Sequence, residues 1–241
     1  MEKQKTQRQK SPGERARRGY HHGDLRKAVL EEALGHINRT RDTSFTLREL
    51  AARLGVSSTA LYRHFDNKLA LLAAVAEEGF KELLRRFLAD DHLKGSDALA
   101  FMAARGLAYV QFAIGYPAHF RVMFLPELRQ PGQFVALTDL RQQVYAQLEV
   151  ALALLKERDF LSDADLREIA LTSWATVHGL STLLVDGHVR LESGSAEEVL
   201  ALVRRVLSVQ AEGFLKDSLR LSKQEKSVAR GPAKKPRRST R

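Results

Sequence analysis

The sequence predicts an all-α protein of about nine helices with no β-sheet. Between the two ends of the 241-residue chain, nearly every segment repeats apolar residues three and four positions apart, as amphipathic helices do. No stretch shows the sustained apolar–polar alternation of a half-buried strand. N-cap residues, glycines and prolines separate the segments. The expected helices cover residues 24–38, 47–54, 58–65, 67–87, 96–116, 117–125, 137–155, 163–185 and 196–214.

The first two helices are bounded by cap signals. Asp24 can cap the first, whose apolar residues fall on one face and which ends near Asn38. Thr46 and Glu49 have the spacing of a capping box and open the second helix. Gly55 ends it.

The third and fourth helices follow closely along the chain. Ser57 or Ser58 caps the third, which we expect to end at residues 64–65. Asp66 or Asn67 then caps a long helix with a continuous apolar face.

The remaining helices are separated by glycine, proline and serine. One begins at residues 95–96, and Pro117 must bend the chain because proline lacks a backbone donor and clashes with the preceding turn. Another helix follows residues 131–132, and Ser162 and Ser195 cap the last two.

Composition restricts the class of protein. Cysteine is absent, which excludes disulfides, thiolate zinc sites and a cysteine nucleophile and suits a reducing compartment. No uncharged apolar run approaches the roughly 18 residues of a membrane span, and the N-terminus has no apolar stretch after its positive charges. We therefore expect a cytoplasmic protein with no membrane partner.

The net charge of +10 is concentrated at the two ends. Residues 1–27 carry nine Lys/Arg and three Asp/Glu, and residues 216–241 carry ten and two, so the middle is mildly acidic. Such ends favour a polyanionic partner. The alternative is that they serve only solubility. Because they lack apolar periodicity, we expect residues 1–21 and 220–241 to be a disordered basic arm and tail.

The segment 46–65, TLRELAARLGVSSTALYRHF, has the spacing of a helix-turn-helix. Leu54 and Leu61 fall on the inward faces of its two helices, and Val56 fills the turn. In this motif the second helix enters the major groove of double-stranded DNA, whereas the first crosses the backbone. An ordinary helical hairpin gives the same periodicity and remains the alternative.

The run GVSSTALYRHFDNKLALLAAV resembles the DNA-binding signature of the tetracycline-repressor (TetR) family of bacterial regulators. The segments 112–124, FAIGYPAHFRVMF, and 174–187, WATVHGLSTLLVDG, are similar to the regulatory domain called WHG, and residues 20–25 resemble the entry to the first helix in that subgroup. Many relatives have a glycine in the turn after the first helix. This chain has none between residues 36 and 54, and Asn38 could end the helix instead.

The resemblance implies a helix-turn-helix domain at residues 22–68 and a helical regulatory and dimerisation domain at 69–219. Ser58 and Thr59 fall where relatives contact bases, and Tyr62, His64 and Lys68 where relatives hold phosphates, a role that suits these side chains. The full set of expected DNA-binding residues is Thr46, Arg48, Ser57, Ser58, Thr59, Tyr62, Arg63, His64 and Lys68.

The family's regulatory domain holds an inducer cavity, so the resemblance also implies a ligand site. The expected lining residues are Phe112, Tyr116, Phe120, Met123, Phe124, Trp174, Val177 and His178. Their chemistry favours a small apolar or aromatic effector, with Tyr116 and His178 as the polar groups that orient it. A plain aromatic core is the alternative. Arg121 could receive an anion, although a salt bridge to a helix carboxylate is the more ordinary use.

No sequence motif indicates an enzyme. The chain has no Gly-rich phosphate loop, no HExxH and no GxSxG, its histidines lack metal spacing, and we expect no cofactor and no metal. The leading hypothesis is a homodimeric, ligand-responsive transcriptional regulator, most simply a repressor, that binds a palindromic operator. The alternatives are an effector-independent architectural DNA-binding protein and a helical enzyme.

Overall fold

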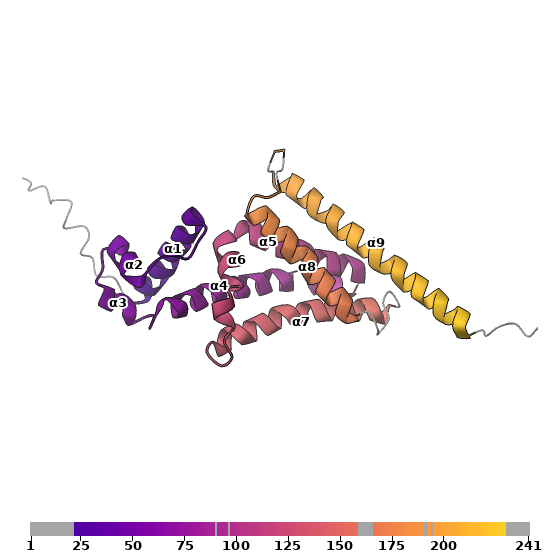
Figure 1. Cartoon of the computed structure of the whole chain (residues 1–241), viewed down its shortest axis with the longest axis horizontal. Helices are drawn as coiled ribbons and strands as arrows, with labels where there is room; N and C mark the ends of the chain where they lie inside the picture. The colour runs from indigo at the N-terminus through magenta and orange to yellow at the C-terminus, as the bar shows by residue number, and fades with distance from the viewer. Residues whose placement is uncertain are drawn as a thin grey trace, which may run out of the picture. The chain divides into compact units, whose positions relative to one another are not determined.

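The computed structural model describes residues 22–89, 91–95, 97–158, 166–189, 192–193 and 195–229 (Figure 1). Within these residues the chain is all-helical, as predicted, and contains no strand. Two 3₁₀ helices, η2 (Asp91–Gly95) and η3 (Pro126–Arg129), accompany nine α-helices. The α-helices are α1 (His22–Thr40), α2 (Leu47–Leu54), α3 (Ser58–Tyr62), α4 (Lys68–Ala89), α5 (Ala98–Gly115), α6 (Pro117–Met123), α7 (Val135–Glu157), α8 (Leu166–Val185) and α9 (Ala196–Ala229).

The described residues fold as two compact units, and the boundary between them lies between Leu71 and Leu72, inside α4. In the first unit α1, α2 and α3 pack against one another. Val29, Ile37, Leu50 and Leu61 are fully buried in this unit. Burial of each such side chain contributes about 1.5–3 kcal/mol, so a small unit of short helices depends on these few residues.

The cap signals of α2 and α3 are present in the structure. Thr46 Oγ1 accepts a hydrogen bond from the backbone of Glu49 at 3.2 Å, and a carboxylate oxygen of Glu49 accepts one from the backbone of Thr46 at 2.7 Å. Gly55 ends α2 with φ of +67°, a conformation open to glycine without strain. Ser57, not Ser58, caps α3, because its hydroxyl accepts from the amide of Ala60 at 3.3 Å.

The turn after α1 differs from the prediction. α1 starts two residues before Asp24, which is therefore inside the helix, and it ends two residues after Asn38. The left-handed residue is Arg41, with φ of +62°. Its amide donates to the carbonyl of Ile37 at 2.8 Å, which closes the last turn of the helix. The turn that glycine makes in many relatives is made here by an arginine.

α3 is shorter than predicted and ends at Tyr62. The amides of His64 and Phe65 both turn back to the carbonyl of Leu61, at 2.9 and 3.0 Å, and this shared acceptor closes the helix. The side chain of Asn67 then accepts from the amide of Ala70 at 2.9 Å and opens α4.

α5 begins after Asp97, not at Gly95 or Ser96 as predicted. The Asp97 carboxylate accepts from the amides of Leu99 and Ala100 at 2.9 and 3.0 Å, which satisfies two free donors at the helix start. The predicted bend lies before Pro117, where α5 stops and α6 starts.

α5 is the central helix of the second unit, in contact with α6, α7, α8 and α9. It is the one described helix long and apolar enough to cross a membrane by length and composition, with a mean hydropathy of 1.4. Its apolar faces meet two buried clusters instead. One joins Ala98 to Leu152 of α7 and Ile169 of α8, and the other joins Val110 to Leu180 of α8 and Val203 of α9.

α9 continues to Ala229, so the predicted start of the tail at residue 220 is wrong by ten residues. Residues 216–229 contain no glycine or proline, and eight of the fourteen are Lys, Arg, Leu, Gln or Glu, which favour helix. The first breakers are Gly231 and Pro232. The predicted arm at residues 1–21, the last residues 230–241 and the predicted cap Ser162 lie outside the described residues.

Candidate nucleic-acid interface and ligand cavity

The surface of the first unit around α3 gathers most of the residues predicted to bind DNA. Leu61 is fully buried and Phe65 is nearly so, and these two side chains anchor α3 in the core. Thr59, Tyr62 and Arg63 are exposed, and Tyr62 keeps 51% of its surface accessible. A short helix with a buried anchor and exposed hydrogen-bonding side chains can approach another molecule without unfolding.

The other predicted residues of α3 and its flanks are only partly exposed. Ser58 and His64 are half-buried, and Ser57 is exposed while its hydroxyl accepts the cap hydrogen bond of α3. Lys68 is half-buried at the start of α4, with Nζ lying 5.1 Å from the ring centroid of Phe45. Its ammonium is thus positioned by an aromatic face.

The start of α2 is less open to an anion than the sequence implied. The amide and hydroxyl of Thr46 both bind the carboxylate of Glu49, which lowers the pKa of Glu49 below its usual value. A negative charge therefore already lies at the N-terminus of α2. Arg48 is exposed in the first turn and remains the available cation there.

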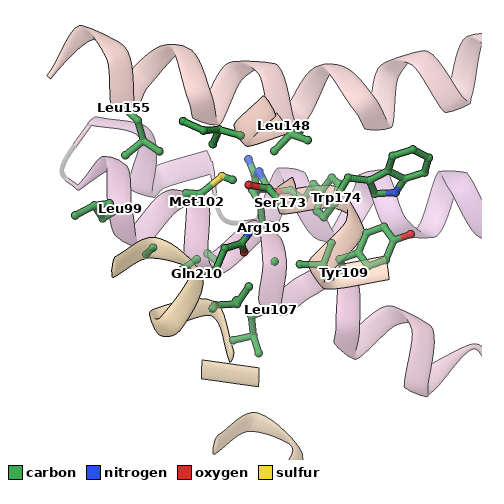
Figure 2. A pocket seen from close by; sticks show the side chains of 18 of the residues that line it. Leu99, Met102, Arg105, Leu107, Tyr109, Leu148, Leu155, Ser173, Trp174 and Gln210 are labelled. Carbon is green, nitrogen blue, oxygen red and sulfur yellow. The ribbon is translucent and has the colours of Figure 1, made fainter. Parts of the chain in front are cut away.

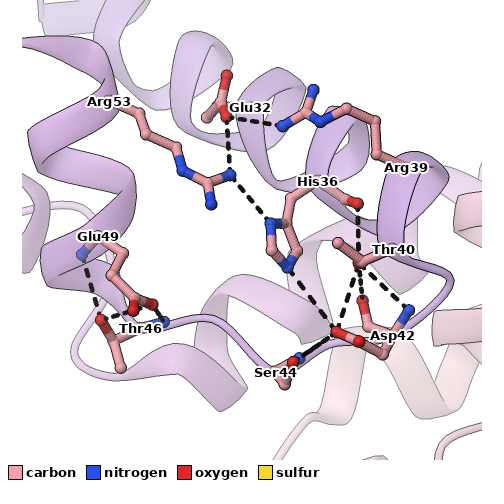
Figure 3. Close-up of polar contacts among 9 residues, drawn as sticks. All are labelled: Glu32, His36, Arg39, Thr40, Asp42, Ser44, Thr46, Glu49 and Arg53. Carbon is pink, nitrogen blue, oxygen red and sulfur yellow. Dashed lines mark hydrogen bonds and ion pairs between the residues drawn. The ribbon is translucent and has the colours of Figure 1, made fainter.

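A polar network joins α1, α2 and the loop between them (Figure 3). Glu32 lies 3.4 Å from both Arg39 and Arg53, and Arg53 also reaches Nδ1 of His36 at 2.9 Å. His36 is 7% exposed and lies edge-on to Phe45. The hydrogen bonds from Ser44 lower the pKa of Asp42, whose carboxylate lies 3.8 Å from Nε2 of His36. These contacts hold α2 and α1 in one geometry.

The second unit contains a cavity of about 890 Å³, within the roughly 300–1,000 Å³ of known ligand sites. Residues of α4, α5, α7, α8 and α9 line it, and the lining is mostly apolar. Figure 2 shows Leu99 and Leu155 toward one end of the cavity, and Tyr109 and Trp174 toward the other. Phe80 and Phe87 of α4 also belong to the wall.

Of the eight predicted ligand residues, the cavity wall includes Phe124, Trp174 and Val177. The other five line no part of it. Phe112 and Met123 are fully buried, and Met123 lies so close to Gly79 that a Cβ there would meet its sulfur at 2.6 Å. These two residues pack between helices, and the small Gly79 is what lets α6 approach α4.

Two ring pairs lie outside the wall, Tyr116 with Phe112 and Phe120 with His178. Tyr116 stacks on Phe112 with ring centroids 5.5 Å apart. Phe120 and His178 lie 5.3 Å apart. Nδ1 of His178 is 2.9 Å from the hydroxyl of Tyr109, which does line the cavity, and burial lowers the pKa of His178. His178 therefore positions a wall residue.

Arg121 makes the salt bridge that was the ordinary alternative for it. Its guanidinium donates to Asp186 Oδ1 and to the carbonyl of Val185, both at 3.0 Å, so it pins the end of α8 to α6.

Three polar wall residues were missed by the sequence analysis. Arg141, Ser173 and Gln210 belong to the cavity wall, and one polar atom of each (Nη2, Oγ and Nε2) is buried with no hydrogen-bond partner within the described residues. Arg141 shares a face of α7 with the wall residues Val144 and Leu148. A polar residue on an apolar helical stripe was the available signal for Arg141 and for Gln210.

Metal binding has no candidate in the part of the chain that the structure describes. Nowhere in that part do three or more His, Asp or Glu side chains lie where they could hold an ion.

Two family models match the chain. A model of bacterial regulatory proteins of the tetR family matches residues 43–75, and a model of the tetracyclin repressor-like C-terminal domain matches residues 102–207. The chain belongs to the TetR family. The first match covers α2, α3 and the start of α4, and the second covers most of α5 through the first turns of α9.

Relatives in the TetR family match parts of the chain. The class C tetracycline repressor of Escherichia coli is 52% identical over 52 residues, 22% of this chain and 24% of that protein. The class G repressor of Vibrio anguillarum is 31% identical over 113 residues, 47% of this chain and 52% of that protein. The alignments thus span about a quarter to a half of these relatives. A tetR-family regulatory protein from Rhodococcus RHA1 has the same fold, with a TM-score of 0.64, 21% identity, and coverage of 78% of this chain and 95% of that one.

Proposed function

We propose that this TetR-family chain is a DNA-binding transcriptional regulator, a repressor that works in the cytoplasm and whose role is binding rather than catalysis. The observation that carries the proposal is α3, which exposes Thr59, Tyr62 and Arg63 while Leu61 and Phe65 anchor it. In a helix-turn-helix this helix reads base edges in the major groove. Ser58 adds a base contact, and Ser57, His64, Lys68 and Arg48 add phosphate contacts around it.

Within this proposal the first unit is the DNA-binding domain and the second is the regulatory and dimerisation domain. A homodimer lets two copies of α3 read the two halves of a palindrome about one helical turn apart, or a multiple of it. The predicted interface is the pair α8 and α9. Leu171, Ala175 and Leu183 are exposed along α8 at intervals of four and eight residues, and Val209 of α9 is 73% exposed.

Small residues on α8 support a close interface, with one change from the expectation. An added Cβ at Gly179 meets no atom within 4 Å, so a partner helix has room to approach there. Ala175 is exposed beside it. Ser181 takes no part, because it is fully buried within its own chain and its hydroxyl donates to the carbonyl of Val177 at 2.7 Å.

The cavity of the second unit is the proposed effector site, and its apolar wall suits a small apolar or aromatic body. For regulation the effector must bind one conformation more tightly than the other, since equal affinity shifts no equilibrium. α4 is the proposed transmitter. It begins directly after the helix-turn-helix, and Phe80 and Phe87, further along it, line the cavity.

The proposal is tested by selecting sequences bound by the full-length protein from random double-stranded DNA and by mapping its sites in the genome. The expected result is a palindromic consensus. Binding with no sequence preference would instead support an architectural protein. Apolar and aromatic metabolites that raise the melting temperature should then be added to the operator complex, and at least one should release the DNA. Turnover of a tested compound would contradict a binding role.

A further inference from the structure

Three polar residues of the cavity wall favour a ligand that accepts hydrogen bonds. Nη2 of Arg141 and Nε2 of Gln210 can only donate hydrogen bonds, and the hydroxyl of Ser173 can donate one. All three atoms are buried without a partner in the described structure, and Ser173 as a whole is 96% buried, since 4% of its surface is exposed. A buried donor without an acceptor destabilises the folded state. Donors of this kind are suited to a ligand that carries acceptor atoms.

Four of the five charged residues of the cavity wall are either engaged in polar contacts or exposed to solvent, and Arg141 is the fifth. Arg105 pairs with Asp91 at 2.5 Å and also donates to the carbonyl of Phe87. Asp97 is occupied by the amides that it caps. The remaining charged wall residues, Arg204 and Glu212, are exposed to solvent on α9.

Arg141 has no carboxylate within salt-bridge distance among the described residues. Burial, together with the like charge of Arg129, lowers its pKa, so its surroundings disfavour the positive charge as they stand. A guanidinium nevertheless stays protonated in proteins. An anion in the cavity would reverse this penalty.

Arg141 lies at the part of the cavity wall that is formed by the rings of Phe80 and Phe124. Its guanidinium carbon lies 5.7 Å from the ring centroid of Phe80. Phe80 lies 5.8 Å from Phe124, and both rings belong to the cavity wall. Apolar side chains of α5 and α7 continue from there toward Leu99 and Leu155 (Figure 2).

We infer that the effector is an amphipathic monocarboxylate, whose carboxylate pairs with Arg141 and whose apolar body fills the rest of the cavity. This inference rests on the proposed function, because it names the ligand class of the proposed effector site. A single guanidinium balances a single negative charge, which favours a carboxylate over a phosphate dianion. Planar, two-pronged pairing with a carboxylate is also the geometry that arginine provides best. Ser173 and Gln210 donate to further oxygen atoms of the ligand.

Trp174 provides a direct readout of binding, because it is the only tryptophan of the chain and lines the cavity. The full-length protein is titrated with decanoate, 1-decanol and decylamine below their micellar concentrations, and tryptophan fluorescence is recorded. The three probes share one body and differ in head-group charge. Decanoate should bind at least tenfold more tightly than decanol, and decylamine should bind most weakly.

Two variants locate the head group. In Arg141→Gln the affinity for decanoate should fall to that for decanol, whereas the affinity for decanol should change by less than twofold. Arg141→Lys keeps the charge but not the two-pronged geometry, so it should recover part of the preference. Arg39→Gln is the matched control, since Arg39 is exposed in the first unit and is not part of the wall, and its preference should equal that of the wild type. Circular dichroism melting of each variant shows whether it is folded.

The outcomes separate this inference from the proposed function. If decanol and decanoate bind equally and both release operator DNA, the effector cavity stands and the carboxylate inference is wrong. If Arg141→Gln weakens both probes alike, the inference is also wrong. If no probe of any charge alters Trp174 fluorescence or operator binding, the inference and the effector role of this cavity fail together, whereas sequence-specific DNA binding can still hold.

Discussion

Arg53 of α2 donates a hydrogen bond of 2.9 Å to Nδ1 of His36 in α1, and this contact crosses between the first two helices of the first unit (Figure 3). A guanidinium can only donate, so Nδ1 is the acceptor and the ring hydrogen lies on Nε2. That nitrogen faces Asp42 at 3.8 Å. One imidazole therefore connects α1, α2 and the loop that joins them.

The first prediction concerns this imidazole. His36→Ala removes a nearly buried ring and its hydrogen bond with Arg53, which keeps only Glu32 as an acceptor, so the free energy of unfolding should fall by about 1–3 kcal/mol. Arg39→Ala removes an exposed partner of Glu32 and should change it by less than about 0.5 kcal/mol. Urea denaturation followed by circular dichroism measures both. Equal effects of the two substitutions would mean that the network does not stabilise the unit through His36.

The second prediction concerns pH. The two hydrogen bonds from Arg85, aided by Arg86, lower the pKa of Glu82 from 4.5 to about 2. A carboxyl with a lowered pKa in the folded state stabilises the protein above its unfolded pKa, and this contribution is lost as the pH falls toward 2. Glu82→Gln should therefore cost about 1 kcal/mol at pH 7, and the difference from the wild type should narrow below pH 4.5.

Chemical denaturation of the two proteins between pH 7 and pH 3 measures this difference. Glu77→Gln serves as the control, because Glu77 pairs with the exposed Lys81 at 3.7 Å and should contribute little at any pH. A Glu82→Gln penalty that is independent of pH would contradict the assignment.

The elements with strong local signals could be predicted from the sequence. α2 has the expected boundaries because a capping box at one end and a left-handed glycine at the other are properties of neighbouring residues. α3 ends earlier than predicted and α9 ends later, because neither end is marked by a local sequence signal. α3 ends where the carbonyl of Leu61 accepts hydrogen bonds from two amides, and the sequence does not encode this geometry in any single residue. The end of α9 is highly charged, so its composition resembles that of a disordered tail although it contains no helix-breaking residue.

The wall of the cavity could be predicted less well than the exposed surface of α3. Exposed positions of a helix-turn-helix follow from spacing alone, so Thr59, Tyr62 and Arg63 were identifiable. The wall of the cavity depends on which helices pack around α5. Met123 therefore looked like a ligand residue but packs against Gly79, whereas Arg141 of α7 was overlooked.

The third prediction concerns the dimer. Gly179→Trp places a large side chain in open space on α8, so the monomer should fold while the partner helix is blocked. Sedimentation velocity at micromolar concentration should give a dimer for the wild type and a monomer for the variant. Gly115→Trp, at an equally open glycine at the end of α5, should remain dimeric. A wild-type monomer, or a dimeric Gly179→Trp protein, would count against the α8–α9 interface.

The fourth prediction concerns the basic C-terminal residues. Removal of residues 230–241 spares α9 and deletes six cations, which are Arg230, Lys234, Lys235, Arg237, Arg238 and Arg241. If these cations contact phosphates, each contact contributes about −0.9 to the slope of log affinity against log salt concentration. The truncated protein should show a flatter slope and unchanged preferences among operators. A changed sequence preference with the same slope would place the residues in base recognition.

The central claim is that α3 reads DNA, and fluorescence anisotropy on the selected operator tests it most directly. Thr59→Ala should lose about 1–3 kcal/mol of binding free energy and relax the preference at one position. Tyr62→Phe should weaken operator and scrambled DNA alike, whereas Tyr145→Phe, the matched change on α7, should bind as the wild type does. Leu61→Asp should fail to bind because a charge in the core unfolds the unit. Wild-type affinity for both Thr59→Ala and Tyr62→Phe, in folded protein, would contradict the assignment of α3 as the recognition helix.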